Sequence, residues 1–198
     1  MTAKHLSFTK IMKNFFYGII ATMISCSALN AQSLAQDLAK NQNFIKLQIA
    51  NEKVLNMPKA ATFGANYNSP DLTKGKETYL SNITGFSVSE ISSLAYEIGS
   101  AGAAVLKDFP SLERMTNVER LELLEAAADI YLSEQRISAA CQGCKRKGLS
   151  SMSNQTFLGL IAGATLSGPF AIWGGWVGAT LGFWQAAEEA LDCIRINC

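Results

Sequence analysis

Histidine is almost missing from this sequence, because its 198 residues include only His5. His5 lies within residues 1–31, which have the form of a cleavable secretory signal peptide. Cleavage leaves no imidazole, and this excludes Ser-His and Cys-His nucleophile pairs as well as every metal site that uses histidine. No other motif identifies a reaction. We therefore interpret the protein as a non-enzyme, with no catalytic residue, no cofactor and no bound metal.

The signal-peptide prediction depends on the order of three features. Basic residues without an acid come first, the apolar run Phe15 to Ile24 follows, and Leu29-Asn30-Ala31 offers a cleavage site before Gln32. The apolar run is too short for a stable membrane span. We expect cleavage near Ala31 and a protein that is secreted or periplasmic. Lipid attachment through Cys26 is a less favoured alternative.

Positive charge is also scarce after cleavage. Three of the 17 lysine and arginine residues leave with the signal peptide, so 14 remain against 16 acidic residues, a formal charge of −2. No global positive field remains to attract phosphates, and we expect no nucleic-acid partner. At 48% hydrophobic and 17% charged residues, the remaining chain is expected to fold around one core. No small-molecule substrate or protein partner can be identified.

No period-two pattern of useful length occurs, so strands are not expected and the fold class is all-α. Apolar residues recur at helical spacing over residues 33–57, followed by a turn-rich stretch at 59–77 that we interpret as a surface loop. Two capping boxes, Ser87 to Glu90 and Thr116 to Glu119, predict the starts of helices that run to about Leu106 and Ala140. The small residues at 99–104 would let another helix approach the first of these closely. The second is expected to bury one face, made by Leu121, Leu124, Ala128 and Tyr131.

The last third has no charged residue between Lys147 and Glu188. This apolar, glycine-rich stretch is interrupted at Gly168-Pro169, which predicts a hairpin of two helices, at about 155–167 and 170–192. We expect a small helical bundle with a C-terminal glycine-rich apolar helical hairpin. The predicted organisation is a signal peptide at 1–31, an amphipathic helical domain at 32–140 and a cysteine-closed hairpin at 141–198.

Glycines four residues apart follow one face of each predicted hairpin helix, a spacing that lets helices pack backbone to backbone. Tryptophans lie in the second helix, and tryptophan suits either a membrane interface or a bulky core. These candidate helix-packing or membrane residues are Gly159, Gly163, Gly174, Gly178, Gly182, Trp173, Trp176 and Trp184.

Four cysteines remain after cleavage, namely Cys141, Cys144, Cys193 and Cys198. An even set in an oxidising compartment predicts two disulfides, although the pairing stays open. The Cys141 to Cys144 spacing also occurs in redox motifs, but these follow a strand in a βαβ unit, which this chain lacks. Zinc held by four thiolates is a further alternative, but Cys193 and Cys198 lack the short spacing.

The segment from Cys141 to Cys198 resembles the membrane-active part of bacterial bacteriocin precursors, because it is apolar, glycine-rich, tryptophan-bearing and closed by cysteines. The resemblance covers under a third of the chain, which also differs in having a conventional signal peptide instead of a double-glycine leader. It implies that the segment enters a lipid membrane.

Two functional hypotheses follow. In the first, residues 32–140 carry a membrane-active, bacteriocin-like C-terminal unit. In the second, the protein is a secreted or periplasmic helical interaction domain, and the hairpin is its core. Burial discriminates between them: packing of the three tryptophans against the helix at 116–140 favours the core, whereas a continuous exposed patch favours the membrane.

Overall fold

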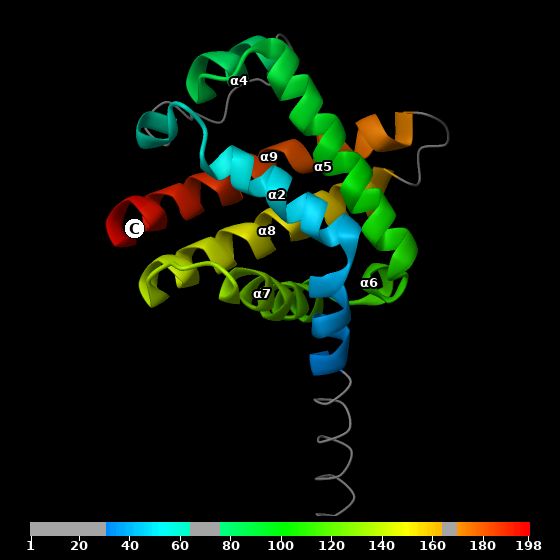
Figure 1. Cartoon of the computed structure of the whole chain (residues 1–198). Coiled ribbons are helices and arrows are strands. Elements are labelled where there is room, and N and C mark those ends of the chain that lie inside the picture. Colours follow the sequence, from blue (N-terminus) through cyan, green and yellow to red (C-terminus); the bar gives the residue numbers. More distant parts are fainter. Residues whose placement is uncertain (1–30, 64–75, 164–169) are drawn as a thin grey trace, which may run out of the picture.

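The computed structural model describes residues 31–63, 76–163 and 170–198, and for residues 76, 77 and 170–181 it describes the backbone alone. The described elements are the helix that includes residues 31–40, α2 (Gln42–Leu55), the 3-10 helix η1 (Ala60–Thr62), α4 (Lys76–Thr84), α5 (Val88–Asp108), α6 (Ser111–Arg114), α7 (Asn117–Ser133), α8 (Ala139–Gly163) and α9 (Phe170–Asn197). These ranges contain no strand (Figure 1). The predicted all-α helical bundle is confirmed.

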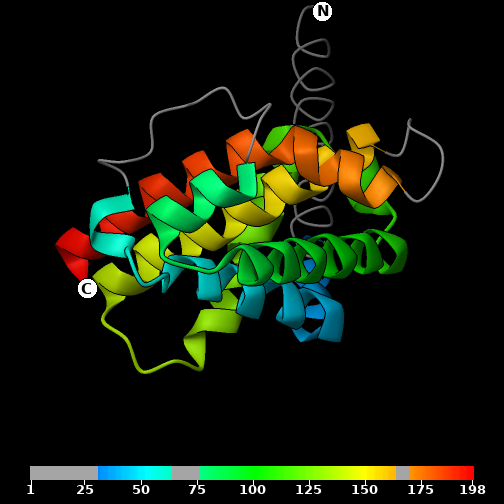
Figure 2. The same cartoon turned by 90° about the horizontal axis from the view of Figure 1, so that it is seen from above.

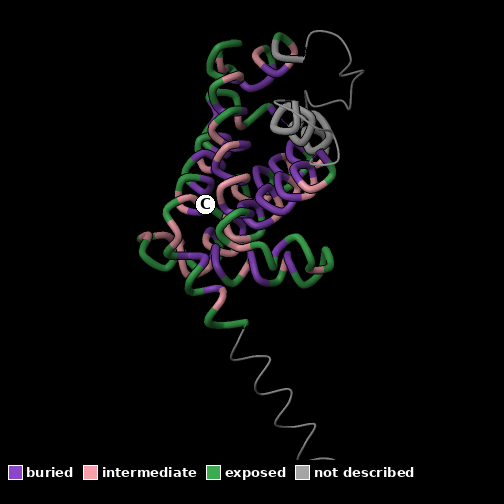
Figure 3. Tube along the Cα trace, turned by 90° about the vertical axis from the view of Figure 1, so that its right-hand side faces the viewer, coloured by how far each residue is buried: buried purple, intermediate pink, exposed green. Residues whose placement is uncertain are grey.

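Helix α8 is the central helix of the bundle. It pairs along its length with α9 and also contacts α7, α5 and α2 (Figure 2). Buried residues follow the inner faces of these helices (Figure 3) and form one hydrophobic cluster. This cluster includes Phe44 of α2, Leu124 of α7, Phe157 of α8 and Trp184 of α9. Residues 32–140 and residues 141–198 therefore contribute to the same core.

The predicted helix starts are confirmed by their capping contacts. Ser87 and Thr116 each accept a hydrogen bond from the backbone N–H of a glutamate three residues later, and each glutamate accepts one in return. Asn41 interrupts the predicted amphipathic segment at 33–57, because its side chain accepts hydrogen bonds from the first N–H groups of α2. Helix α5 ends before Pro110, as expected from the restricted backbone of the residue before a proline.

Several predicted boundaries are wrong. Helix α9 continues to Asn197, beyond the expected end near residue 192, and the stretch at 59–77 that was expected to be a loop includes η1 and the start of α4. The helix that begins after Thr116 ends at Ser133 and not at Ala140, and the first hairpin helix begins at Ala139 and not near residue 155. The physical reason is that residues 139–154 are largely polar but are packed between α2, α7 and α9, so tertiary contacts keep them helical. The Ser138 hydroxyl accepts the N–H of Cys141 where α8 starts.

Small residues permit close contact where the sequence predicts it. A Cβ added at Gly102, in the middle of α5, would lie 2.9 Å from side-chain atoms of both Thr156 and Leu160 of α8. Gly148 of α8 faces Ala190 of α9 so closely that a Cβ there would overlap the alanine methyl group. These glycines set the distances between the central helix and its two neighbours.

Candidate functional site

The four cysteines form a clamp, defined here as the two disulfides between the start of α8 and the end of α9. Cys141 is bonded to Cys198 and Cys144 to Cys193, with sequence separations of 57 and 49 residues. Both cysteines of the CxxC motif therefore pair with α9 and not with each other. The clamp holds the α8/α9 hairpin closed at the end where the chain enters α8.

The second half of α9 belongs to the core. The Trp184 side chain is only 2% exposed, and its ring lies 5.7 Å from that of Phe63 and 5.5 Å from that of Phe183, measured between centroids. Ala186, Ala187, Ala190 and Leu191 continue this buried face. Trp184 is thus buried as the core hypothesis expects, although its described ring neighbours do not come from α7.

The other predicted hairpin residues divide into two groups. Gly159 and Gly163 are buried on α8, and a Cβ added at Gly182 of α9 would overlap the amide of Gln155 on α8. The side chains at Trp173, Gly174, Trp176 and Gly178 lie outside the described residues, although their backbone belongs to α9. Residues 1–30 of the predicted signal peptide, including His5 and Cys26, and the Gly168-Pro169 interruption also lie outside them.

A polar cluster around Glu52 joins three helices and was not predicted. One carboxylate oxygen of Glu52 accepts from the Tyr131 hydroxyl at 3.0 Å, and the other accepts from the Gln135 amide at 3.1 Å and the Lys145 ammonium at 3.4 Å. Burial raises the pKa of Tyr131 well above its usual range, and the negative charge of Glu52 raises it further. Tyr131 is therefore a neutral hydrogen-bond donor. The cluster links α2, α7 and α8 because its polar groups form hydrogen bonds with one another.

A second polar cluster lies inside the bundle. The fully buried amides of Gln48 and Asn51 on α2 both donate to the Ser153 hydroxyl of α8 at 3.1 Å. Within the described structure, the carbonyl oxygens of these two amides have no hydrogen-bond partner. Unpaired buried oxygens cost free energy, so this contact stabilises the packing of α8 on α2 less than a fully hydrogen-bonded cluster would.

A buried arginine fastens the short helix α6 to α7. Arg120 is 4% exposed and donates to the backbone carbonyls of Leu112 at 2.9 Å and Met115 at 2.8 Å. A third nitrogen lies 3.4 Å from the amide oxygen of Asn154 on α8. Burial lowers the pKa of Arg120 from the usual arginine value. The guanidinium group thereby holds the chain around residues 112–115 in place.

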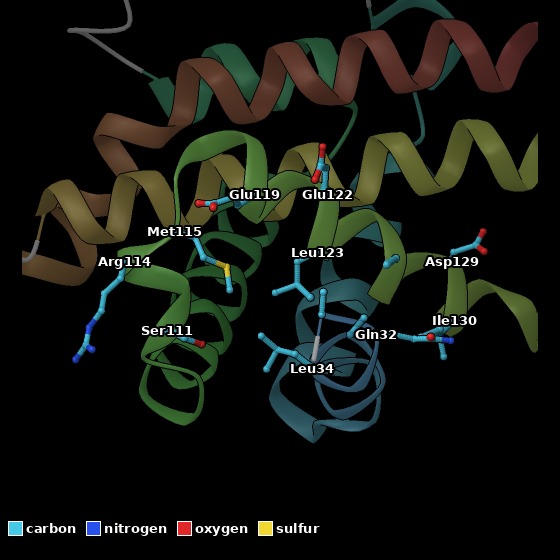
Figure 4. Close-up of a pocket in the computed structure, with 13 residues that line it drawn as sticks. Gln32, Leu34, Ser111, Arg114, Met115, Glu119, Glu122, Leu123, Asp129 and Ile130 are labelled. Carbon is cyan, nitrogen blue, oxygen red and sulfur yellow. The ribbon is translucent and has the colours of Figure 1, made fainter. Parts of the chain in front are cut away.

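A groove lies between the helix at residues 31–40 and the α6 to α7 segment (Figure 4). Its volume is about 840 Å³, within the range of sites that bind ligands or side chains. The groove-lining residues are Ala31, Gln32, Leu34, Ala35, Ser111, Arg114, Met115, Glu119, Glu122, Leu123, Ala126, Asp129 and Ile130. Sequence patterns gave no signal for it, because the two walls are separated by about 80 residues.

The described ranges contain no metal-binding cluster and no membrane-spanning helix. No group of three or more histidine, cysteine, aspartate or glutamate residues there could hold a metal ion. Within the same ranges, no helix has the length and apolar character needed to cross a bilayer. Comparison of the chain with models of protein families, with characterised proteins and with solved structures finds no match.

Proposed function

We propose that this protein is an exported helical binding protein, stapled by disulfides, in which the α8/α9 hairpin is the structural core. The observation that carries this proposal is the burial of Trp184 and of the α9 face that follows it. In a unit that enters membranes from the folded state, this apolar face would be available to lipid. Here it packs against residues from other parts of the chain, including Phe63.

Export is supported by two independent features. Disulfides persist in oxidising compartments, and this chain has two. The first 31 residues have the pattern of a signal peptide. N-terminal sequencing of the exported protein should therefore begin near Gln32. A chain that begins at Cys26 and carries added acyl mass would instead identify a lipoprotein.

A binding role fits the polar clusters better than catalysis does. The residues that most resemble a catalytic combination of acid, base and nucleophile are Glu52, Tyr131 and Lys145. They are hydrogen-bonded to one another between helices, and none of them lines the groove. This set is therefore engaged in contacts between helices and is not directed at the groove.

The competing function is the bacteriocin-like one, and it makes an opposite prediction. The charge-free stretch between Lys147 and Glu188 supports it. To enter a bilayer as a hairpin, however, α8 and α9 must leave the core they share with α2, α5 and α7. Membrane activity would thus require loss of the folded structure, whereas binding would require its retention.

Dye release from anionic lipid vesicles separates the two functions. We expect the oxidised, full-length exported protein to cause no release at micromolar concentration, and its tryptophan emission to stay unchanged when vesicles are added. A known membrane-permeabilising peptide provides the positive control. Dye release by the folded, oxidised protein would overturn the proposal, and a weaker effect of Gly178→Leu would then identify helix association as the cause.

A further inference from the structure

The groove described above combines an apolar floor with a charged rim. Leu34 and Leu123 lie opposite each other across it, with Met115 at one end and Ile130 at the other (Figure 4). Ala126 is exposed and leaves space in the same wall. A groove of this composition accepts apolar side chains presented at helical spacing, which is how an amphipathic helix binds.

The rim of the groove is acidic. Three carboxylates line it, those of Glu119, Glu122 and Asp129, against two cations: Arg114, which extends away from Leu123 (Figure 4), and the α-amino group of Gln32 that cleavage after Ala31 would create. Glu119 is held by the capping hydrogen bonds from Thr116, and Asp129 lies 3.4 Å from Arg146. Among the described residues Glu122 has no ion-pair partner. Its charge is therefore available to a ligand.

The walls of the groove are fixed by buried contacts. Leu123 and Ala35 are part of the hydrophobic core, and the Arg120 guanidinium group ties the backbone at Leu112 and Met115 to α7. Binding would therefore require little rearrangement of the groove, and a preformed site costs less free energy to occupy.

We infer that this groove binds a basic amphipathic helix of a partner protein, with its apolar face on Leu34, Leu123 and Ile130 and its basic residues against the acidic rim. The inference rests on the proposed binding function and names the class of partner. Charge complementarity selects this occupant, because an acidic or uncharged apolar segment would leave the Glu122 carboxylate without a countercharge.

Fluorescence anisotropy with a labelled model helix tests the inference. The probe is an amphipathic peptide of leucine and lysine, added to the oxidised exported protein, and the control probe is a scrambled peptide of the same composition. We expect binding in the micromolar range for the amphipathic order and at least about tenfold weaker binding for the scrambled order. Added salt should weaken the complex without abolishing it, since part of the affinity is apolar.

Three variants locate the binding. Ala126→Arg places a bulky side chain and one positive charge in the groove at an exposed position, and Glu122→Lys reverses the charge of one rim residue. Each should weaken binding by about tenfold or more. Glu134→Lys changes the net charge of the protein by the same amount as Glu122→Lys, but Glu134 is exposed at the end of α7 and does not line the groove. It should change affinity less than about twofold.

Several results would overturn the inference. One is that Ala126→Arg binds the amphipathic peptide as tightly as the original protein does. Another is that Glu122→Lys and Glu134→Lys weaken binding by the same factor. A third is that the scrambled peptide binds as tightly as the amphipathic one. If sedimentation shows a dimer of the original protein and a monomer of Ala126→Arg, the occupant of the groove is a second copy of this chain. Thermal unfolding of each variant establishes that it is folded. Absence of peptide binding overturns only the groove inference, whereas dye release from vesicles overturns the proposed function itself.

Discussion

Removing the two disulfides singly and together tests whether the clamp acts as one unit. The disulfides close loops of similar length, because their sequence separations are 57 and 49 residues. Loop-closure entropy gives about 4 kcal/mol for either one in an otherwise open chain. If the two were independent, each removal would cost this amount and the two costs would add.

The nested pairing changes this expectation. Cys141 and Cys144 are one helical turn apart on α8, and Cys198, which directly follows α9, is five residues from Cys193 of α9. Once one disulfide is closed, the other closes a loop of only about eight residues, for which the same relation gives roughly 2.5 kcal/mol. We therefore expect removal of either disulfide to lower the free energy of unfolding by about 2.5 kcal/mol, and removal of both by about 6.5 kcal/mol.

Urea denaturation followed by circular dichroism measures these differences. The variants are Cys141→Ala with Cys198→Ala, Cys144→Ala with Cys193→Ala, and all four together. Alanine is preferred to serine because the first two cysteines are buried. The original protein held in reductant is the control and should match the fourfold variant. Single removals that each cost about 4 kcal/mol and add would refute the nested-loop reasoning. Thiol titration of the unreduced, denatured protein should find no free cysteine.

Three further predictions concern single positions. Gly148→Ala should destabilise the protein by about 1–3 kcal/mol because the added methyl group would overlap Ala190 of α9. Gly143→Ala has open space around it and should stabilise the protein by up to about 1 kcal/mol. Urea denaturation compares the two variants. Ser153→Ala should lower the free energy of unfolding by about 1–3 kcal/mol because the buried amides of Gln48 and Asn51 lose their acceptor. Ser151→Ala on the same helix should lower it little. Equal losses in the two variants would contradict the role of Ser153 as the acceptor. The Glu119 carboxyl should titrate by NMR below its usual pKa of 4.5, because the N–H and hydroxyl of the capping residue stabilise its charge. The stability that the Glu119 carboxylate contributes is then complete above pH 4.5 and is lost as the pH falls through the lowered pKa. A titration midpoint at the usual value would mean that the capping box is open in solution.

Local signals predicted the helix starts well. The capping boxes at Ser87 and Thr116 depend on residues within four positions of each other, so the sequence alone contains the whole interaction. The same is true of Asn41, whose side chain caps α2. The small-residue stretch around Gly102 correctly indicated a close helix neighbour, but it could not identify that neighbour as α8.

Helix α8 was mispredicted at its start because its polar residues are not on a solvent-facing side. Ser150, Ser153 and Asn154 are buried by helices that come from distant parts of the chain. Ser153 and Asn154 are hydrogen-bonded to α2 and α7, and no local pattern encodes these partners, whereas the Ser150 hydroxyl donates to the Lys147 carbonyl of α8 itself. Periodicity of apolar residues therefore indicated a helix only from about residue 155.

The candidate site was less predictable than the fold. The Glu52 cluster brings together residues 79 to 93 positions apart, and the groove has one wall from residues 31–35 and the other from residues 111–130. On α7, Leu121 and Tyr131 were expected on the buried face, but Leu123, Ala127 and Leu132 are buried there with Leu124 and Ala128. This rotation of the helix decides which of its carboxylates border the groove.

The nested disulfides have a consequence for proteolysis. Any single backbone cut between Cys144 and Cys193 leaves the two pieces covalently joined through both cross-links. Such a nicked protein would migrate as one molecule without reductant and separate into two fragments only after reduction. Protease resistance in a non-reducing gel would therefore overestimate how intact the hairpin backbone is. A single cut can release a fragment from this region only if it lies before Cys141, and that fragment leaves with both cross-links in place.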